Sequence, residues 1–294
     1  MDFKKYQESA EATDAMRDRS DEDARVVSLL GLASEGSGLL SAYKKFVRDG
    51  ESFAVDKEAV REELGDTLWY LSTVATHYGL DLNDIAEANL AKVRQLYLLA
   101  KPSTVRYFDD AYPASERIPR AFTVTFRPDP NDSAVLLLES DGRRLGSPLR
   151  DNSYAGDDYR FHDAFHLAYA AHLAWSPVTR FFFKCKRKSD SKIDEVEDGG
   201  RAIAIEEGIA AFIFDEAKRK HLYEGVTKID YALIKQVRRL VEPFEVCVRT
   251  EKDWESTILA GFRVFRQLRE NLGGTVSVDL ESRSIEYVSK CQPS

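Results

Sequence analysis

The chain has 294 residues, of which 43% are hydrophobic and 31% charged, which suits two soluble globular domains rather than a disordered segment. No apolar run reaches the ~20 residues that span a bilayer, and the N-terminus lacks the apolar core of a signal peptide. The three cysteines, Cys185, Cys247 and Cys291, are too far apart and too few for a disulfide framework. These features predict a cytoplasmic protein with no membrane partner.

The net charge of −8 is concentrated in the first part of the chain. Residues 1–100 hold 12 basic and 19 acidic side chains, whereas the rest of the chain holds 30 and 31. An acidic surface repels the phosphate backbone, so nucleic acid is not expected as a partner. A small acidic domain can still bind phosphates when a divalent metal bridges the two.

Residues 1–100 are expected to form helices throughout. Apolar residues recur at helical spacing from Val26 to Phe46 and again from Val60 to Ala75. Gly50 and Gly79 are expected to end helices, and Asp81 is expected to cap a last helix over about residues 82–99. The first domain is therefore predicted to be an all-α, up-and-down helical bundle.

Residues 101–118 are predicted to be a linker, because the stretch KPSTVRYFDDAYPASERIP contains three prolines and breaks the helical period. Residues 119–294 then mix both periods. AFTVTFRP, AVLLLESDGRRL, TVSVDL and IEYVS alternate as strands, whereas helices are expected at about 159–175, 201–219, 230–243 and 254–271. We expect a mainly α protein whose C-terminal domain is α+β with a small antiparallel sheet.

The segment EELGDTLWYL carries three carboxylates on a predicted helix. Glu63 and Asp66 are three residues apart and Glu62 and Asp66 four apart, so both pairs share a helical face. Like charges so close in an apolar run are typical of a cation site, and oxygen ligands favour Mg²⁺ or Mn²⁺. The alternative is a solvated turn with Glu62 and Glu63 facing water.

Four segments together decide between these readings: GLxxE, KKxxRDG, EELGDxLWYL and LDLNDIAEANLAKV, spread over residues 28–97. Their order and spacing resemble the MazG-like nucleotide pyrophosphohydrolases. In that family an ExxE segment and an ExxD segment on neighbouring helices hold magnesium around a nucleoside triphosphate. Glu35 matches the first glutamate of ExxE, Glu63 and Asp66 match ExxD, and Asn89 and Lys92 match positions near the substrate.

The resemblance implies metal-assisted hydrolysis of a (d)NTP to the monophosphate and pyrophosphate. Magnesium would be held by Glu35, Glu63 and Asp66, with Lys45, Arg48 and Lys92 as phosphate contacts. For Lys45 and Arg48 the alternative is a solvated helix end, where cations suit the helix dipole. The resemblance also implies a homo-oligomer, most simply a dimer.

Two departures from the family pattern matter: Leu96 stands where the family often has a basic residue, and Gly38 stands where the second glutamate of ExxE is expected. Its loss would weaken metal binding or shift coordination to Glu62 or to water. The alternative function is therefore a weakened nucleotide sensor that regulates a C-terminal effector or metallohydrolase domain.

The second domain has a cluster of its own. His162 and His166 lie one helical turn apart with Asp163 between them, and Glu206 and Glu207 lie in an apolar helix downstream. Two histidines and a carboxylate suit a metal site, whereas the alternative is a hydrogen-bonded core pair without metal. His172 is expected near the same helical face.

A basic run, Lys184 and Lys186–Lys188, suits either a phosphate or nucleic-acid contact or a solvated loop. The region from RFHDAFH to EEG is similar to the C-terminal extension of some MazG-like proteins. That resemblance brings no chemistry with it.

Overall fold

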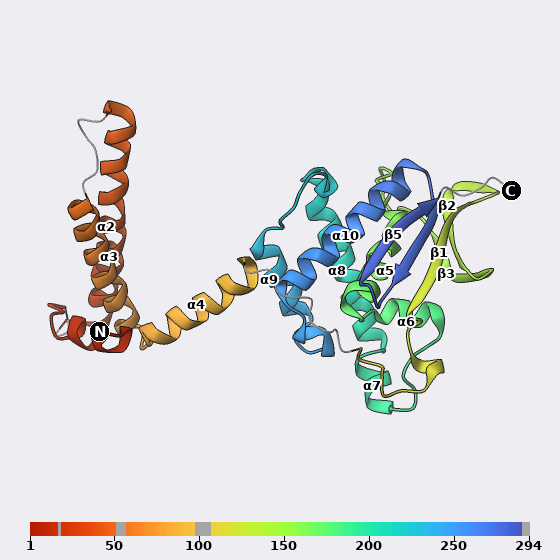
Figure 1. The fold of residues 1–294 in the computed structure, drawn as a ribbon, viewed down its shortest axis with the longest axis horizontal. Helices are drawn as coiled ribbons and strands as arrows, with labels where there is room; N and C mark the ends of the chain where they lie inside the picture. The colour runs from red at the N-terminus through yellow and green to blue at the C-terminus, as the bar shows by residue number, and fades with distance from the viewer. Residues whose placement is uncertain (17–18, 51–56, 98–106, 290–294) are drawn as a thin grey trace. The chain divides into compact units, whose positions relative to one another are not determined.

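The computed structural model describes residues 1–16, 19–50, 57–97 and 107–289. The chain divides into two compact units, residues 1–98 and 99–294, and each is described by itself. The first is helical and the second combines helices with one sheet (Figure 1). The fold class predicted from the sequence, mainly α with an α+β C-terminal part, is confirmed.

Local signals set the helices of the first unit. Ser20 caps α2, where its hydroxyl accepts from the Asp23 N–H, and Gly50 ends α2 with a φ of 86°. Gly79 follows α3 with a φ of 66°, and the Asp81 carboxylate accepts from the backbone at the start of α4. The predicted stops and cap are thus confirmed. The helices are α1 (Phe3–Glu11), α2 (Asp21–Asp49), α3 (Lys57–His77) and α4 (Leu82–Tyr97).

The packing of this unit differs from a regular four-helix bundle. Helices α2 and α3 pack against each other, α1 packs on α3, and α4 packs on α1 and runs on beyond the α2–α3 pair (Figure 1). Gln7 ties these parts together, since its amide donates to Thr76 and its carbonyl accepts from the Leu82 N–H. The prediction that this unit is all-helical is confirmed, but α4 does not pack as a further antiparallel helix of an up-and-down bundle.

Much of the apolar surface of this unit is uncovered. Exposed fractions between 41% and 72% are found along α2 at Val26, Val27, Leu29, Leu30, Leu40, Tyr43 and Val47, and Leu64 of α3 is 53% exposed. Helix α2 is long and apolar enough to cross a membrane by length and composition alone. One such helix is weak evidence for a membrane span, because the core helix of a soluble protein or a signal sequence meets the same criteria.

The second unit contains one antiparallel five-stranded sheet in the order β3-β2-β1-β4-β5. Burial alternates along β4, with Val276 and Val278 buried, as the period of two predicts. The strands are β1 (Ala121–Asp129), β2 (Asp132–Ser140), β3 (Arg143–Leu149), β4 (Gly274–Asp279) and β5 (Ser284–Ser289).

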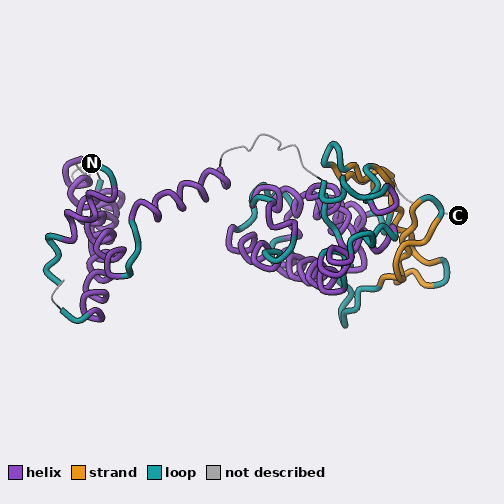
Figure 2. The backbone as a smooth tube through the Cα atoms, turned by 90° about the horizontal axis from the view of Figure 1, so that it is seen from below, coloured by secondary structure: helices purple, strands orange, loops and turns teal. Residues whose placement is uncertain are grey.

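Helices cover this sheet and form the larger part of the unit (Figure 2). Almost every residue of α5 is buried, and α5 packs on α10, where Gly261 allows Phe165 to approach closely. A capping box of Thr250 and Asp253 starts α10. The helices are α5 (Asp163–Leu173), α6 (Pro177–Phe183), α7 (Ser191–Val196), α8 (Gly200–Lys218), α9 (Tyr231–Leu240) and α10 (Glu251–Glu270).

Candidate functional site

The contact between α2 and α3 determines which predicted carboxylates of the two helices lie opposite each other. A Cβ atom on Gly31 would lie 2.1 Å from the Tyr70 ring, and one on Gly38 would lie 2.5 Å from the Glu63 carboxylate. These two contacts make the helices antiparallel neighbours. Glu35 lies one turn past Gly31 on the same face of α2, so this register puts it at the level of Asp66.

Glu63 is the predicted ligand whose carboxylate lies against the neighbouring helix α2. Its Oε1 and Oε2 lie 2.7 and 2.5 Å from the position of an added Gly38 Cβ, so the carboxylate fills the space where a side chain at residue 38 would begin. Its Oε2 is buried and has no hydrogen-bond partner in the described part of the chain. A buried carboxylate oxygen without a donor is costly, and a bound cation would remove that cost. An oxygen donor facing the gap between two helices fits the Mg²⁺ that the sequence predicts.

The other carboxylates are more open. Glu35 is half-buried, whereas Glu62 and Asp66 are exposed. Within residues 1–16, 19–50 and 57–97 no three ligand atoms lie within 4.8 Å of one another, so these side chains share a face without converging on one point. The ligand assignments for Glu35, Glu62, Glu63 and Asp66 remain predictions.

Tyr6 of α1 joins this face, which the sequence did not indicate. Burial raises the pKa of the Tyr6 phenol, and the charge of Asp66 raises it further. Nothing in the pattern of α1 distinguishes this tyrosine from a packing residue. Next to Tyr70 in sequence, Trp69 donates its indole N–H to Thr13 and packs edge-on against the Tyr70 ring, which agrees with a packing role.

The predicted phosphate contacts are distributed unevenly. Lys45 is exposed two turns beyond Gly38 on the same face of α2. Arg48 is paired with Asp49 at 2.5 Å, and Asn89 is exposed on α4. The side chain of Lys92 lies outside the described residues. The structure thus leaves Lys45 as the basic side chain best aligned with the carboxylates.

The predicted cluster of the second unit does come together. His162 Nε2 and His166 Nε2 lie 3.5 and 3.4 Å from Glu207 Oε2, and Asp163 Oδ1 lies 3.5 and 3.8 Å from the same two nitrogens. Three of these residues, His162, His166 and Glu207, are the one group of described residues whose ligand atoms all lie within 4.8 Å of one another.

Glu206 takes a different place from the one predicted. It accepts from His166 Nδ1 at 2.9 Å, from the Ser176 hydroxyl at 2.6 Å and from the Val178 N–H at 2.8 Å. His172 is also outside the cluster, and burial together with Arg283 and Arg263 lowers its pKa to about 4. The expected position of His172 near the same helical face does not bring it into the cluster.

Charge within the cluster is strongly coupled. Burial alone would lower the pKa of His166, but the carboxylates of Glu206, Glu207 and Asp163 outweigh it and raise the pKa to about 10. Burial would raise the pKa of Glu207, but the imidazoles of His162 and His166, whose Nε2 atoms lie 3.5 and 3.4 Å from its Oε2, lower it well below its usual range. Burial raises the pKa of Asp163, which the two histidines oppose.

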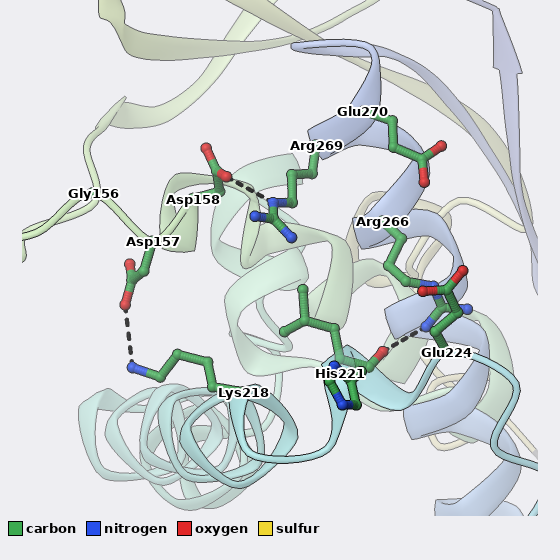
Figure 3. Close-up of a pocket in the computed structure, with 10 residues that line it drawn as sticks. Gly156, Asp157, Asp158, Lys218, His221, Glu224, Arg266, Arg269 and Glu270 are labelled. Atoms are coloured by element: carbon green, nitrogen blue, oxygen red, sulfur yellow. Dashed lines mark hydrogen bonds and ion pairs between the residues drawn. The ribbon is translucent and has the colours of Figure 1, made fainter.

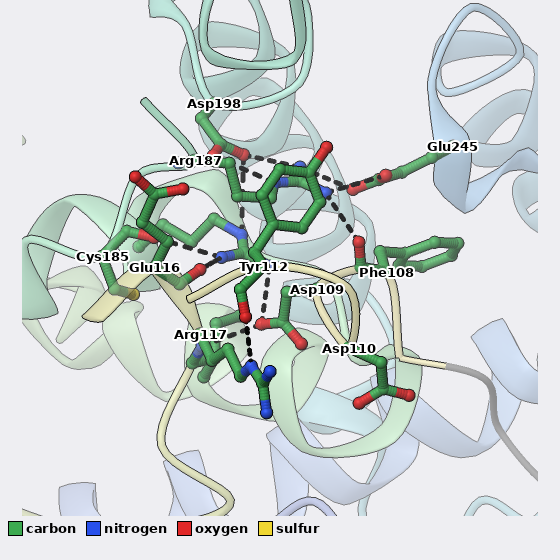
Figure 4. Close-up of polar contacts among 12 residues, drawn as sticks. Phe108, Asp109, Asp110, Tyr112, Glu116, Arg117, Cys185, Arg187, Asp198 and Glu245 are labelled. Carbon is green, nitrogen blue, oxygen red and sulfur yellow. Dashed lines mark hydrogen bonds and ion pairs between the residues drawn. The ribbon is translucent and has the colours of Figure 1, made fainter. Parts of the chain in front are cut away.

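The basic run after α6 divides into two parts. Arg187 is buried and forms a salt bridge with Asp198 at 2.7 Å and with Glu245 at 2.7 Å (Figure 4). Arg187 therefore belongs to a core ion pair, and for this residue both alternatives, a phosphate or nucleic-acid contact and a solvated loop, are wrong. Lys184, Lys186 and Lys188 instead line a pocket of about 540 Å³ together with Arg144.

A second pocket, of about 620 Å³, lies beside the segment that leads into His162 (Figure 3). Its charges are already paired, since Lys218 contacts Asp157 at 3.2 Å and Arg269 contacts Asp158 at 2.8 Å. The pocket therefore offers no excess charge of either sign from these four side chains.

The chain combines a helical unit that carries carboxylates along one face and an α+β unit that contains a histidine–carboxylate cluster. Comparison with protein families gives the class of the protein. Residues 6–96 match the MazG nucleotide pyrophosphohydrolase domain, and residues 103–291 match the MazG C-terminal domain, so the chain belongs to the MazG family. Comparisons with curated proteins and with solved structures give no match.

Proposed function

We propose that the N-terminal unit hydrolyses a nucleoside triphosphate to the monophosphate and pyrophosphate, in a reaction that depends on Mg²⁺. The observation that carries the proposal is the buried Glu63 Oε2, which faces Gly38 and has no donor among the described residues. Glu35 and Asp66 lie at the same level of the two helices and would complete the ligand set. The family match supports the reaction class.

The chain's own residues divide the work by charge. Glu35, Glu63 and Asp66 repel a triphosphate, so substrate binds only with a divalent cation between them. When bound, Mg²⁺ would offset the phosphate charge and favour attack by water at the α-phosphorus. Lys45, on the same face of α2, is placed for the outer phosphates, with Arg48, Asn89 and Lys92 as further candidates.

The missing side chain at residue 38 has a role in this proposal. Because Gly38 has no Cβ, the Glu63 carboxylate can lie against the backbone of α2. One glutamate thus occupies the space between the helices that two would otherwise share. This arrangement accounts for the departure from ExxE without loss of the site.

We also propose that two copies of the chain pair through α2. The uncovered apolar side chains of this helix, among them Leu30, Leu40 and Val47, form a longer apolar face than α3 covers. Burying apolar area gives about 25 cal/mol per Å², which favours association over exposure to water.

A pyrophosphate-release assay over a panel of ribo- and deoxyribonucleoside triphosphates tests the function. Glu63→Gln keeps the size of the side chain and removes its charge, and Glu58→Gln, on the exposed side of α3, is the matched control. The proposal requires Mg²⁺-dependent pyrophosphate that Glu63→Gln abolishes and Glu58→Gln leaves unchanged. Calorimetry showing nucleotide binding with no turnover of any nucleotide would favour the sensor function that Gly38 suggests.

A further inference from the structure

We propose that His162, His166 and Glu207 bind a divalent first-row transition metal such as Zn²⁺ in the C-terminal unit, with the Asp163 carboxylate beside both histidines. This site is separate from the carboxylates of α2 and α3 and lies in the part of the family match that names no activity. Its chemistry also differs, since two imidazoles and a carboxylate favour Zn²⁺, Fe²⁺ or Mn²⁺ over Mg²⁺.

The ligand atoms of His162, His166 and Glu207 all lie within 4.8 Å of one another, which suits a shared metal ion. Metal–ligand bonds of about 2.1 Å around a tetrahedral Zn²⁺ put neighbouring ligand atoms about 3.4 Å apart. The four nitrogen–oxygen distances in the cluster are 3.4, 3.5, 3.5 and 3.8 Å. Hydrogen bonds from N–H to oxygen would be about 2.7–3.2 Å. These distances are longer than ordinary hydrogen bonds and close to the spacing of ligands around one cation.

The outer contacts turn both imidazoles toward the same point. His162 Nδ1 lies 2.9 Å from the Tyr159 carbonyl, and His166 Nδ1 lies 2.9 Å from Glu206 Oε1. A carbonyl and a carboxylate accept, so each Nδ1 donates its proton outward. When a cation displaces the Nε2 proton of His166, each Nε2 offers its lone pair to the cluster, and this is the arrangement of histidines that bind metals.

Glu206 is held in place for this purpose. Ser176 and Val178 donate to its two oxygens, so the carboxylate that orients His166 is itself fixed by the start of α6. His166 Nε2 is fully buried and has no hydrogen-bond partner among the residues described. A core histidine pair would need one partner on each nitrogen, and this nitrogen lacks one. The ring of Tyr159 stacks on His162 at 4.4 Å and shields it from water.

The cluster has one open side. The Glu207 side chain is 42% exposed, whereas those of His162, His166 and Asp163 are 11% exposed or less. A cation can therefore enter past Glu207, which as a flexible carboxylate on the surface of α8 is able to close over it. Glu207 is also the ligand whose replacement disturbs packing least.

The test uses the full-length protein purified without chelator, analysed for metal by mass spectrometry, then stripped and titrated with Zn²⁺ by calorimetry. Co²⁺ serves as a second probe, because its visible absorption reports nitrogen ligands. We expect one Zn²⁺ per chain and retention in excess Mg²⁺. Loss of an outer partner weakens metal binding about 10–100-fold, so Glu207→Gln, which removes a direct ligand, is expected to weaken it at least as much.

Two control variants keep the result specific. Glu216→Gln, on the same helix, and Glu63→Gln, in the N-terminal unit, should bind Zn²⁺ as the unmodified protein does. Circular dichroism of Glu207→Gln verifies that the variant is folded. Failure of the folded, unmodified protein to bind Zn²⁺ or Co²⁺, or equal affinity in Glu207→Gln, would overturn the proposal whatever the N-terminal unit hydrolyses.

Discussion

Replacing Gly38 with alanine separates the proposed role of this glycine from its effect on the helix. The added Cβ would lie 2.5, 2.7 and 2.9 Å from the three carboxylate atoms of Glu63, where ordinary contacts are 3.4–4 Å. The carboxylate must therefore move by about 1 Å, which it can do because it is the free end of a flexible side chain. Helix α2 itself should gain, since alanine is more favourable than glycine in a helix by about 1 kcal/mol.

Gly36 provides the matched control, because it is on the same helix and a Cβ there meets nothing within 4 Å. Both variants gain the same helix propensity, and only Gly38→Ala displaces Glu63. A misplacement of about 1 Å at a reacting centre can lower the rate about 100-fold. We therefore expect Gly38→Ala to lose up to about two orders of magnitude of pyrophosphate release while Gly36→Ala keeps full activity.

The assay is initial-rate pyrophosphate release at saturating nucleotide over a series of Mg²⁺ concentrations, with thermal unfolding of each variant alongside. A higher Mg²⁺ requirement in Gly38→Ala would place the defect in metal binding. Equal activity of the two variants would refute the reasoning, because Glu63 would then not need its position against α2. An equal loss in both would point to α2 as a whole and would count against it as well.

Four further predictions concern stability and assembly. In Gly31→Ala the new Cβ would lie 2.1 Å from the rigid Tyr70 ring, so the midpoint of thermal unfolding should fall, and combining it with Tyr70→Ala should recover part of the loss; additive losses would contradict this. Burial, and after it the charge of Glu245, raises the pKa of Glu197 from 4.5 to about 7. The folded state therefore binds a proton more tightly than the unfolded state, and the free energy of unfolding should decrease by about 3 kcal/mol as the pH rises from about 4.5 to 7. Glu197→Gln should flatten that dependence in denaturant titrations, and an unchanged slope would exclude Glu197 as its source. Arg187→Ala should destabilise the C-terminal unit by about 3–5 kcal/mol in the same titrations, because it leaves Asp198 buried with only the longer 3.5 Å contact to Arg180 as an ion pair; a loss below about 1 kcal/mol would show that the Arg187–Asp198 pair is dispensable. Light scattering at micromolar concentration should give a dimer that Leu40→Glu dissociates and the exposed control Val248→Glu does not, and a monomeric unmodified protein would rule out the pairing.

The helices and strands were predictable where their signals are local. Gly50 and Gly79 end helices because a positive φ is accessible to glycine, and Asp81 caps α4 through its own side chain. The alternation of β4 and β5 follows from burial of one side of each strand. Such features depend on residues a few positions apart, which the sequence displays directly.

The misses depend on contacts between distant residues. Arg187 reads as one cation of a basic run, but Glu245 is 58 positions away, and only the fold brings it to the guanidinium. Helices α6 and α7 are seven and six residues long, too short for a periodic pattern to establish. The course of α4 beyond the α2–α3 pair likewise has no local signal.

Adjacent glutamates illustrate the limit for the candidate sites. Glu206 and Glu207 are chemically identical in the sequence, and helical rotation alone turns one toward His166 Nδ1 and the other toward Nε2. The sequence predicted that this group belongs together, but the division between orienting and ligand carboxylates required the structure. For α2 and α3 the family resemblance already named the individual carboxylates. The structure added the close approach of Glu63 to Gly38.

Phosphorus NMR of the products formed from a nucleoside triphosphate by the full chain, in Mg²⁺ and then in chelator, tests the central claim most directly. We expect the monophosphate and pyrophosphate in Mg²⁺ and no turnover in chelator. The Glu63→Gln variant should show no turnover under either condition. Release of the diphosphate and inorganic phosphate, or unchanged turnover by Glu63→Gln, would contradict it.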